Sequence, residues 1–318
     1  MQSFSVPLID CRNLYFMKYA NQSTKTLDHK KYVIDSFISS LPENVTQITS
    51  QDIAKWKDSL NVSNNTLNGN LVILRQFLSF ANAFGIKSEL PIIREYIDTY
   101  IPYLFTSEEI NKLIEAADNN ISYSRSANTK TFCFPMILRL LAFCGLRLNE
   151  ALELEINDFY DEPGIIILHK TKNNRERVIP LHSSLSELLS LYKMKLLKIY
   201  PHSKYMFPDC TLKSTLTKGQ IEYEFKKILS QVGFDNHHAK NERGICLHCF
   251  RHTFAVESFR KLKTEHGEID NTIPILSTYL GHSRLNETEK YLKFSYDLFP
   301  EEAELFDDYC KDVFGGIL

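Results

Sequence analysis

Apolar side chains in residues 1–98 recur every three to four positions, the spacing that places them on one face of a helix. In segment 23–41 they are Leu27, Tyr32, Val33, Phe37, Ile38 and Leu41. Segments 49–60 and 64–85 repeat the pattern, with polar residues between the apolar positions. The pattern predicts three or four helices that bury their apolar faces against one another in a small bundle.

Cap residues mark the ends of these helices. Ser23 or Thr24 is placed to accept a hydrogen bond from the first turn of one helix, and Gly85 is placed to end another. Thr106, followed by a serine and two glutamates, predicts the start of a further helix. Prolines interrupt the pattern shortly before that point, so we predict a linker at 99–106.

Residues 107–318 combine helical patterns with one hairpin signal. The β-rich runs Ile165–Leu168 and Val178–Leu181 flank a polar turn at Asn173-Asn174. Helical spacing returns in "TKGQIEYEFKKILSQVGF" and "HCFRHTFAVESFRKLK". The chain is therefore predicted to be mainly α with a small β-hairpin, an α+β fold, in which an N-terminal helical domain precedes a larger second domain.

Composition narrows the class of protein. The chain has 318 residues, of which 43% are hydrophobic and 24% charged, as in ordinary globular proteins. No apolar run reaches the roughly 18 residues that a membrane span needs, and the N-terminus has no basic start with an apolar core. We expect a cytoplasmic protein with no membrane partner. Its seven cysteines are scattered, which favours thiols over a disulfide framework.

The acidic net charge of −2 comes from one end of the chain. Residues 1–98 hold 10 Lys and Arg against 9 Asp and Glu, and residues 99–296 hold 26 against 23. Residues 297–318 hold 1 against 7. The first 296 residues are mildly basic, which permits contact with a nucleic acid.

Two cationic motifs indicate an anion site. In "LLAFCGLRLNEALEL", Arg147 lies among leucines, where a guanidinium group is costly to bury unless it meets an anion. Glu150 is the structural alternative as its partner. In "LHCFRHTFA", His248 and Arg251 lie three apart on one helix face, while we expect His252 to point elsewhere. An arginine fork with a histidine able to move a proton suits a phosphate.

The segment "STYLGHSRLNETEKYLKF" adds His282 and, nine residues later, Tyr291. From the residues alone, its aromatic side chains are packing residues and His282 caps a helix. Tyr279, which precedes the Gly-His pair on an apolar helix face, is predicted to belong to the core.

Taken together, these residues resemble the tyrosine recombinase (phage integrase) family in type, order and spacing. "TKNNRERVIPL" supplies the family's hairpin lysine between the first two motifs. The matching positions are Arg147, Lys172, His248, Arg251, His282 and Tyr291. The resemblance implies a site-specific recombinase or integrase, typical of mobile elements, that cuts and rejoins DNA through a 3′-phosphotyrosyl intermediate.

The resemblance assigns the nucleophile and the groups around the phosphate. Tyr291 is the implied nucleophile, with Tyr296 as its rival. A phenol with a pKa near ~10 needs help at neutral pH, and His248 is the implied base. Arg147 and Arg251 would neutralise the charge that develops on the non-bridging oxygens, as an oxyanion hole does.

The remaining roles follow from the same resemblance. Lys172 would protonate the leaving 5′ oxygen, and Lys170 or Arg175 could take its place. His282 would hydrogen-bond the phosphate, and Glu150 would orient Arg147 or His248. No metal and no other cofactor is expected, because the arginines supply the positive charge.

The resemblance covers residues 105–296 by motif, so the implied catalytic domain is 107–318. Residues 1–98 resemble the family's core-DNA-binding domain only in position and helical character. One departure concerns the 30 residues between Arg251 and His282, more than compact members have. We predict that the extra length is a polar loop, "RKLKTEHGEIDNTIP".

The partners implied are double-stranded DNA and, in a synaptic complex, three further copies of the chain. The isolated chain is expected to be a monomer or weak oligomer, located at the nucleoid, with DNA-bending proteins as possible accessory factors. A helix is predicted at about 298–314, because apolar residues recur there at helical intervals. It docks either on its own domain or, as the resemblance favours, on a neighbouring subunit.

Three alternatives stay open at this point. Cys246, His248, Cys249 and His252 could form a zinc site, although a second CxxC pair is missing. A type IB topoisomerase would use the same chemistry to relax DNA. A DNA-binding factor without catalysis would tolerate replacement of any of these residues, which argues against it because the full set is present.

Overall fold

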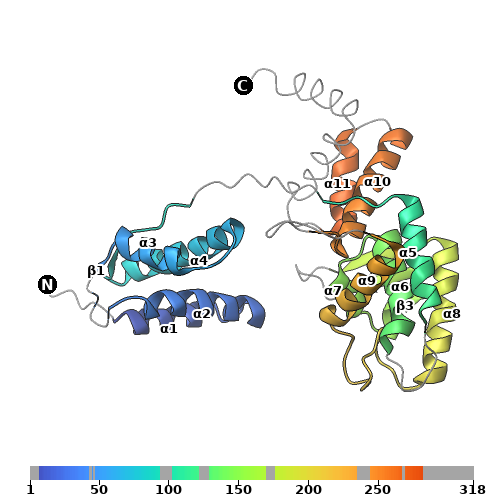
Figure 1. The fold of residues 1–318 in the computed structure, drawn as a ribbon, viewed down its shortest axis with the longest axis horizontal. Helices are drawn as coiled ribbons and strands as arrows, with labels where there is room; N and C mark the ends of the chain where they lie inside the picture. The colour runs from blue at the N-terminus through green and yellow to red at the C-terminus, as the bar shows by residue number, and fades with distance from the viewer. Residues whose placement is uncertain are drawn as a thin grey trace. The chain divides into compact units, whose positions relative to one another are not determined.

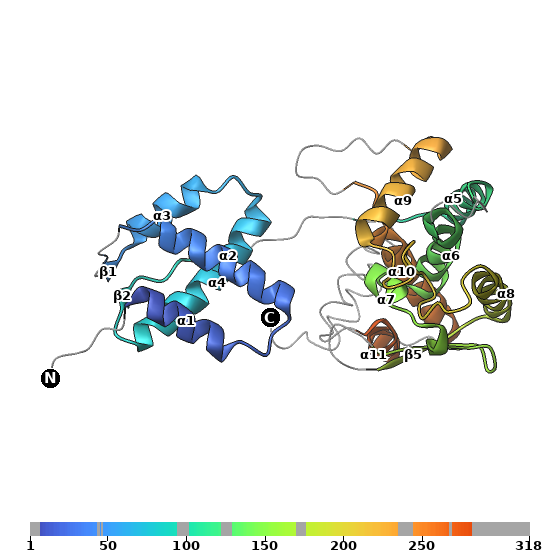
Figure 2. The same cartoon turned by 90° about the horizontal axis from the view of Figure 1, so that it is seen from below.

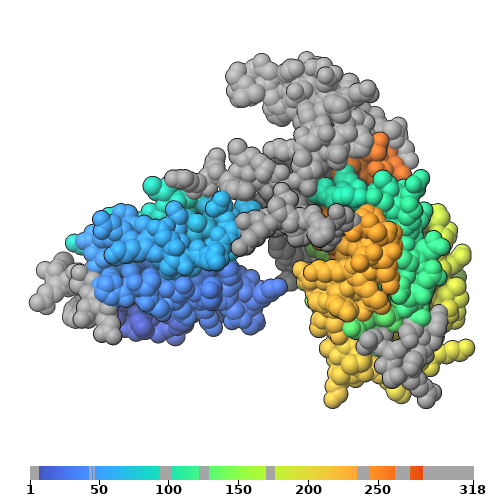
Figure 3. Space-filling view, in the orientation of Figure 1, coloured from blue at the N-terminus to red at the C-terminus, as the bar shows by residue number. Residues whose placement is uncertain are grey.

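The computed structural model describes residues 7–42, 45, 47–93, 102–121, 129–169, 176–234, 244–266 and 269–281. The chain divides into two compact units, Met1–Thr99 and Tyr100–Leu318 (Figure 1). Figure 3 shows the same chain in a space-filling view, with colours that run from blue in the first unit to orange in the second. In the described part of the chain, no helix has both the length and the apolar character of a membrane span.

Four helices lie in the described part of the first unit. Its elements are α1 (Leu8–Lys18), α2 (Thr24–Ser39), β1 (Gln47–Ile48), α3 (Ser50–Ser59), α4 (Asn64–Ala83) and β2 (Lys87–Ser88). The long helix α4 contacts both α1 and α2 (Figure 2). Aromatic residues fill the space between the helices, and Phe37 and Trp56 meet edge to face with ring centroids 5.5 Å apart.

The predicted helices of the first unit are confirmed, with differences at single residues. Ser23 caps α2 by accepting a hydrogen bond from the backbone N–H of Thr26, and Gly85 follows α4 with a φ of +90°. Tyr32 was wrongly included in the buried face, since it is 67% exposed. Helix α1 and the parallel pairing of β1 with β2 were not predicted.

The second unit surrounds one buried helix. Its elements are α5 (Ser107–Asn119), α6 (Thr129–Cys144), α7 (Leu148–Leu152), η1 (Ile156–Asp158), β3 (Phe159–Tyr160), β4 (Ile165–Leu168), β5 (Arg177–Pro180), α8 (Ser183–Ile199), α9 (Lys218–Val232), α10 (His248–His266) and α11 (Ile269–Leu280). Helix α6 contacts α5, α7, α8, α9 and α10. Most of its side chains are buried because it is apolar on every face.

A small antiparallel sheet with the order β3-β4-β5 lies beside the helices. The predicted hairpin is confirmed, which with the helices gives the predicted α+β fold. Its second strand begins at Arg177 rather than Val178, and Arg177 pairs with Leu168 of β4. Alternation along β5 places Arg177 and Ile179 on the buried side and Val178 in solvent.

Two segments differ from the prediction. The polar segment after Arg251 was predicted to be a loop, but α10 continues to His266 and α11 begins at Ile269, with Pro274 inside it. Lys, Arg and Glu have high helix propensity, so a polar segment of this composition can form a helix as well as a loop. Phe105, within the range predicted as linker, is 4% exposed and stacks on Phe250 of α10, so it belongs to the core of the second unit.

Candidate active site

Gly145 and Arg147 connect two helices that meet at a sharp turn. Gly145 ends α6 with a φ of +60°, and a Cβ at this position would overlap the ring of Phe254. Both constraints favour glycine. Arg147 then occupies the N-cap position of α7, with its side chain 23% exposed. The turn therefore places Arg147 at the start of α7, directly after the buried helix α6.

Glu150 holds Arg147 from within the same short helix. The backbone N–H of Arg147 donates to Oε2 of Glu150 at 2.9 Å, and its Nη1 donates to Oε1 at 2.8 Å. The carboxylate therefore caps α7 and orients the arginine with the same two oxygens. Glu150 is 5% exposed, so this contact is made in an environment of low dielectric.

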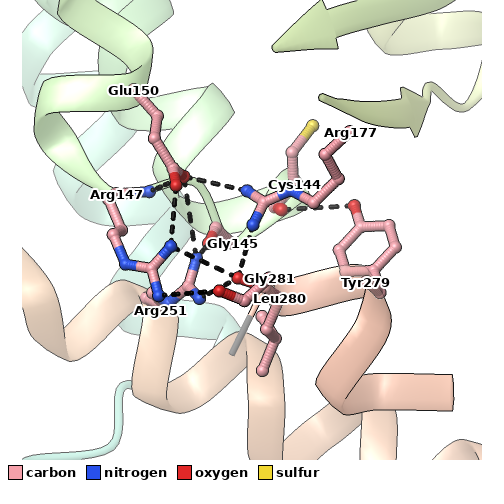
Figure 4. Close-up of polar contacts among 9 residues, drawn as sticks. All are labelled: Cys144, Gly145, Arg147, Glu150, Arg177, Arg251, Tyr279, Leu280 and Gly281. Atoms are coloured by element: carbon pink, nitrogen blue, oxygen red, sulfur yellow. Dashed lines mark hydrogen bonds and ion pairs between the residues drawn. The ribbon is translucent and has the colours of Figure 1, made fainter. Parts of the chain in front are cut away.

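The same carboxylate attracts two more arginines (Figure 4). Nη2 of Arg177 donates to Oε2 of Glu150 at 2.9 Å, and Nη1 of Arg251 lies 3.8 Å from that oxygen. Arg251 is 1% exposed. Three guanidinium groups thus share one carboxylate, and these four side chains carry a surplus of positive charge.

The C-terminal end of α11 provides the other acceptors. The carbonyl of Leu280 accepts from Nη2 of Arg251 at 2.6 Å and from Nη1 of Arg177. Arg147 lies 3.4 Å from the carbonyls of Leu280 and Gly281. The last carbonyls of a helix have no partner within it and carry partial negative charge, so a helix end suits this role. Arg251 also donates to the carbonyl of Gly145 at 2.7 Å.

The electrostatics of the cluster favour ionised groups. Burial raises the pKa of Glu150, but the charge of Arg177 and the hydrogen bonds from Arg147 outweigh it, and the net pKa lies below the ordinary value. Burial lowers the pKa of Arg177, while Glu150 opposes that effect. Because guanidinium groups start from a pKa above ~12, Arg177 remains charged at neutral pH.

Glu150 also lines an acidic cavity. The cavity has a volume of about 340 Å³ and is lined mainly by carboxylates, with Leu154, Leu168 and His169 completing the wall. Its acidic residues are Glu150, Glu153, Glu155 and Asp158. Such a cavity repels a phosphate, so an anion would approach the cluster from the side on which Arg147 is exposed.

The predicted site residues fall into two groups. Arg147 and Arg251 are brought together through Glu150 and Leu280, although 104 positions separate them in the chain. His248 begins α10, one turn before Arg251, and is exposed. Lys172, His282 and Tyr291, with the rivals Lys170, Arg175 and Tyr296 and the predicted tail helix, lie outside the described residues.

One of two expectations about neighbouring residues needs correction. We predicted that His252 points away from His248, but the rings meet edge to face with centroids 4.6 Å apart. Residues four apart are neighbours on a helix surface, which the prediction overlooked. Glu150 was expected to orient Arg147 or His248, and the structure shows its contact with Arg147.

The zinc alternative finds no support in the described part of the chain. There, no three His, Cys, Asp or Glu side chains come together as metal ligands. The Sγ atoms of Cys246 and Cys249 lie 3.7 Å apart, well beyond a disulfide bond of about 2.05 Å.

Tyr279 packs as predicted, since its ring stacks on Phe254 and its hydroxyl donates to the carbonyl of Cys144 at 3.2 Å.

Arg177 was missed by sequence reasoning. The available signal was strand alternation in "RERVIPL", which places an arginine on the same face as the buried Ile179. From the sequence we considered other cations of the hairpin as proton donors and gave Arg177 no role in the active site. An arginine at an inward position of a strand needs a buried anion, and Glu150 is that anion.

Comparison with known proteins identifies the chain. Residues 104–297 match the sequence pattern of the phage integrase family. The chain belongs to that family. This recombinase is 30% identical over 215 residues to the putative integrase/recombinase y4rB of Sinorhizobium fredii, a match that covers 66% of this chain and 67% of the relative. It is 25% identical to the tyrosine recombinase XerA of Pyrococcus horikoshii, over 91% of this chain and 90% of that protein.

Solved structures show the same fold. A XerH site-specific recombinase bound to a palindromic difH substrate, in a post-cleavage complex, matches with a TM-score of 0.65 and 20% identity, covering 96% of this chain and 91% of that one. A lambda integrase tetramer bound to a Holliday junction matches with a TM-score of 0.67 and 17% identity, covering 91% and 78%. The chain is thus a tyrosine-type site-specific recombinase by family and by fold.

Replacement of Glu150 tests the shared carboxylate. Its folded pKa lies below the ordinary 4.5, so the stability that it contributes is present above about pH 4.5 and is lost as the pH falls through the folded pKa. We expect Glu150→Gln to lower the free energy of unfolding by about 3 kcal/mol at neutral pH, because buried guanidinium groups lose their counter-charge. Denaturant titrations should show this gap shrinking below about pH 4.5.

The exposed Glu153→Gln on the same turn is the matched control and should change stability by less than about 0.5 kcal/mol. If the difference in the free energy of unfolding between wild type and Glu150→Gln stays constant as the pH falls through the acid range, Glu150 does not act as a charged group.

Proposed function

We propose that the protein cuts and rejoins double-stranded DNA at a specific site through a covalent 3′-phosphotyrosyl bond at Tyr291. The observation that carries the proposal is the cluster of Arg147 and Arg251 around Glu150, held by the end of α11. His282 follows that helix end directly, and Tyr291 follows nine residues later. The relatives named above act as recombinases, and this chain carries the full set of residues.

The arginines act on the charge of the transition state. Attack on a phosphodiester adds negative charge to the two non-bridging oxygens, and fixed cations stabilise that charge more than they stabilise the ground state. Arg251 is fixed by two backbone carbonyls, and Arg147 by both oxygens of Glu150 through its backbone and side chain. Each such donor contributes about 3 kcal/mol, about a hundredfold in rate.

Proton transfers complete the step. The phenolic oxygen of Tyr291 forms a bond to phosphorus as the bond from phosphorus to the 5′ oxygen breaks. His248 accepts the phenolic proton, and its exposed position at the start of α10 leaves it accessible to DNA. Lys172 gives a proton to the leaving 5′ oxygen. His282 hydrogen-bonds the phosphate. The reverse sequence joins a new 5′ hydroxyl to the phosphotyrosine.

Strand exchange requires more than one active site. Four copies of the chain, one for each strand end, would form the synaptic complex, and the lambda integrase structure is a tetramer on a Holliday junction. In the proposal, residues 1–98 and 107–318 each contact DNA. The acidic tail docks on a neighbouring subunit. DNA-bending proteins assist assembly at the nucleoid, in the cytoplasm.

Trapping the covalent intermediate tests the nucleophile. A nicked target-site DNA that loses a short fragment after cleavage cannot be rejoined, so the protein stays attached. We expect wild type to form this adduct and Tyr291→Phe to form none, because only the phenolic oxygen is removed. The matched control, Tyr296→Phe, should form it at a rate within a few-fold of wild type. An adduct with Tyr291→Phe, or its loss with Tyr296→Phe, would reject Tyr291.

Removal of residues 300–318 tests the role of the tail. If the tail holds a neighbouring subunit, its deletion should lower recombination of two target sites at least tenfold while single-site DNA binding stays within about twofold. Gel-shift titrations and a two-site recombination assay measure the two quantities. Equal losses in both would instead place the tail on its own domain.

A further inference from the structure

Arg177 lies in the hairpin, at a point where its side chain contacts the neighbouring helices. It is the first residue of β5 and pairs with Leu168, the last residue of β4. Lys172 lies between these two strands in the sequence, five positions before Arg177. The Arg177 side chain is 8% exposed and lies on the buried side of the strand. Its guanidinium group therefore holds the end of β5 that is nearest in sequence to the proposed acid.

The contacts of Arg177 reach two other parts of the site (Figure 4). Nη2 donates to Oε2 of Glu150 on α7 at 2.9 Å. Nη1 donates to the carbonyl of Leu280, at the end of α11 and two residues before His282. One side chain thus joins the hairpin, the Arg147 helix and the segment that leads to His282.

Gly281 leaves the space that this contact needs. Its φ is +64°, and a Cβ at this position would overlap Nη1 of Arg177. Glycine is therefore required both by the backbone and by the arginine. The sequence accommodates Arg177 from two sides, with Glu150 as its counter-charge and Gly281 as the gap.

We propose that Arg177 is a positioning residue that fixes the Lys172 hairpin against the end of α11, so that the proton donor reaches the leaving 5′ oxygen. The proposal rests on the function assigned above to Lys172. Arg177 itself does not bind the phosphate, because its side chain is buried and its two Nη atoms donate hydrogen bonds to Glu150 and to the carbonyl of Leu280. It acts through the hairpin.

This role predicts a defect in one step of the reaction. Without Arg177 the hairpin loses its contacts with Glu150 and Leu280, whereas Arg147 and Arg251 still lie beside Glu150. The charge of the transition state should therefore still be stabilised, but the proton should reach the leaving 5′ oxygen more slowly. A misplacement of about 1 Å is enough to cost about a hundredfold in rate. The defect should vanish when the leaving group needs no proton.

A 5′-bridging phosphorothiolate supplies such a leaving group. In this DNA, sulfur replaces the scissile 5′ oxygen, and a thiol has a pKa near ~8.5, far below that of an alcohol, so the thiolate departs without an acid. We expect Arg177→Met to slow cleavage of ordinary DNA about a hundredfold and to cleave the phosphorothiolate within a few-fold of wild type. DNA affinity should stay within about twofold.

Three variants make the result decisive. Lys172→Ala should show the same rescue, and Arg260→Met, the same replacement at an exposed position of α10, should show no defect. Arg177→Lys keeps the charge and one possible contact; it should show a smaller defect with the same rescue, and it replaces Arg177→Met if that variant does not fold.

The outcomes separate the two hypotheses. Rescue of Lys172→Ala without rescue of the Arg177 variants would overturn the positioning role and leave the function intact. If Lys172→Ala is not rescued either, the assignment of Lys172 fails, and the role of Arg177 fails with it. A wild-type cleavage rate in the Arg177 variants would also overturn the proposal.

Discussion

One buried carboxylate organises the second unit's polar centre. Glu150 caps its own helix, holds Arg147, pairs with Arg177 and lies near Arg251. Removing a carboxylate from water costs several kcal/mol, and only close cations with good hydrogen bonds repay that cost. Because three arginines from distant parts of the chain meet this one group, the turn after α6, the hairpin and α10 can adopt few alternative arrangements. The surplus positive charge is then available to a phosphate.

Helix ends position the cluster as much as charges do. Gly145 ends α6 and Gly281 ends α11, each with a positive φ and each beside a side chain that leaves no room for a Cβ. The carbonyl of Gly145 accepts a hydrogen bond from Arg251, and the carbonyl of Gly281 accepts one from Arg147. The terminal carbonyls of a helix need partners from outside it. The arginines provide them, so the packing of α11 and the orientation of the guanidinium groups depend on each other.

Local patterns predicted the elements better than they predicted the contacts between them. Neighbouring residues determine the Ser23 cap, the end of α4 at Gly85 and the hairpin. These features could therefore be predicted from the sequence. The segment that contains Pro274 was predicted to be a loop, but it begins α11, because the packing of that helix outweighs the one backbone hydrogen bond that a proline removes. The convergence of Arg147 and Arg251 came from family resemblance, whereas Arg177 is a long-range partner that no local pattern reveals without the fold. Lys172, His282 and Tyr291 remain predictions.

The central claim is that Arg147 neutralises charge on a non-bridging oxygen of the scissile phosphate. Its most direct test compares Arg147→Ala with wild type on ordinary DNA and on DNA with a methylphosphonate at the scissile position, where a neutral methyl group replaces one charged oxygen. The account predicts a loss of about a hundredfold on ordinary DNA that shrinks to a few-fold on the methylphosphonate. An equal loss of cleavage rate on both substrates would contradict it.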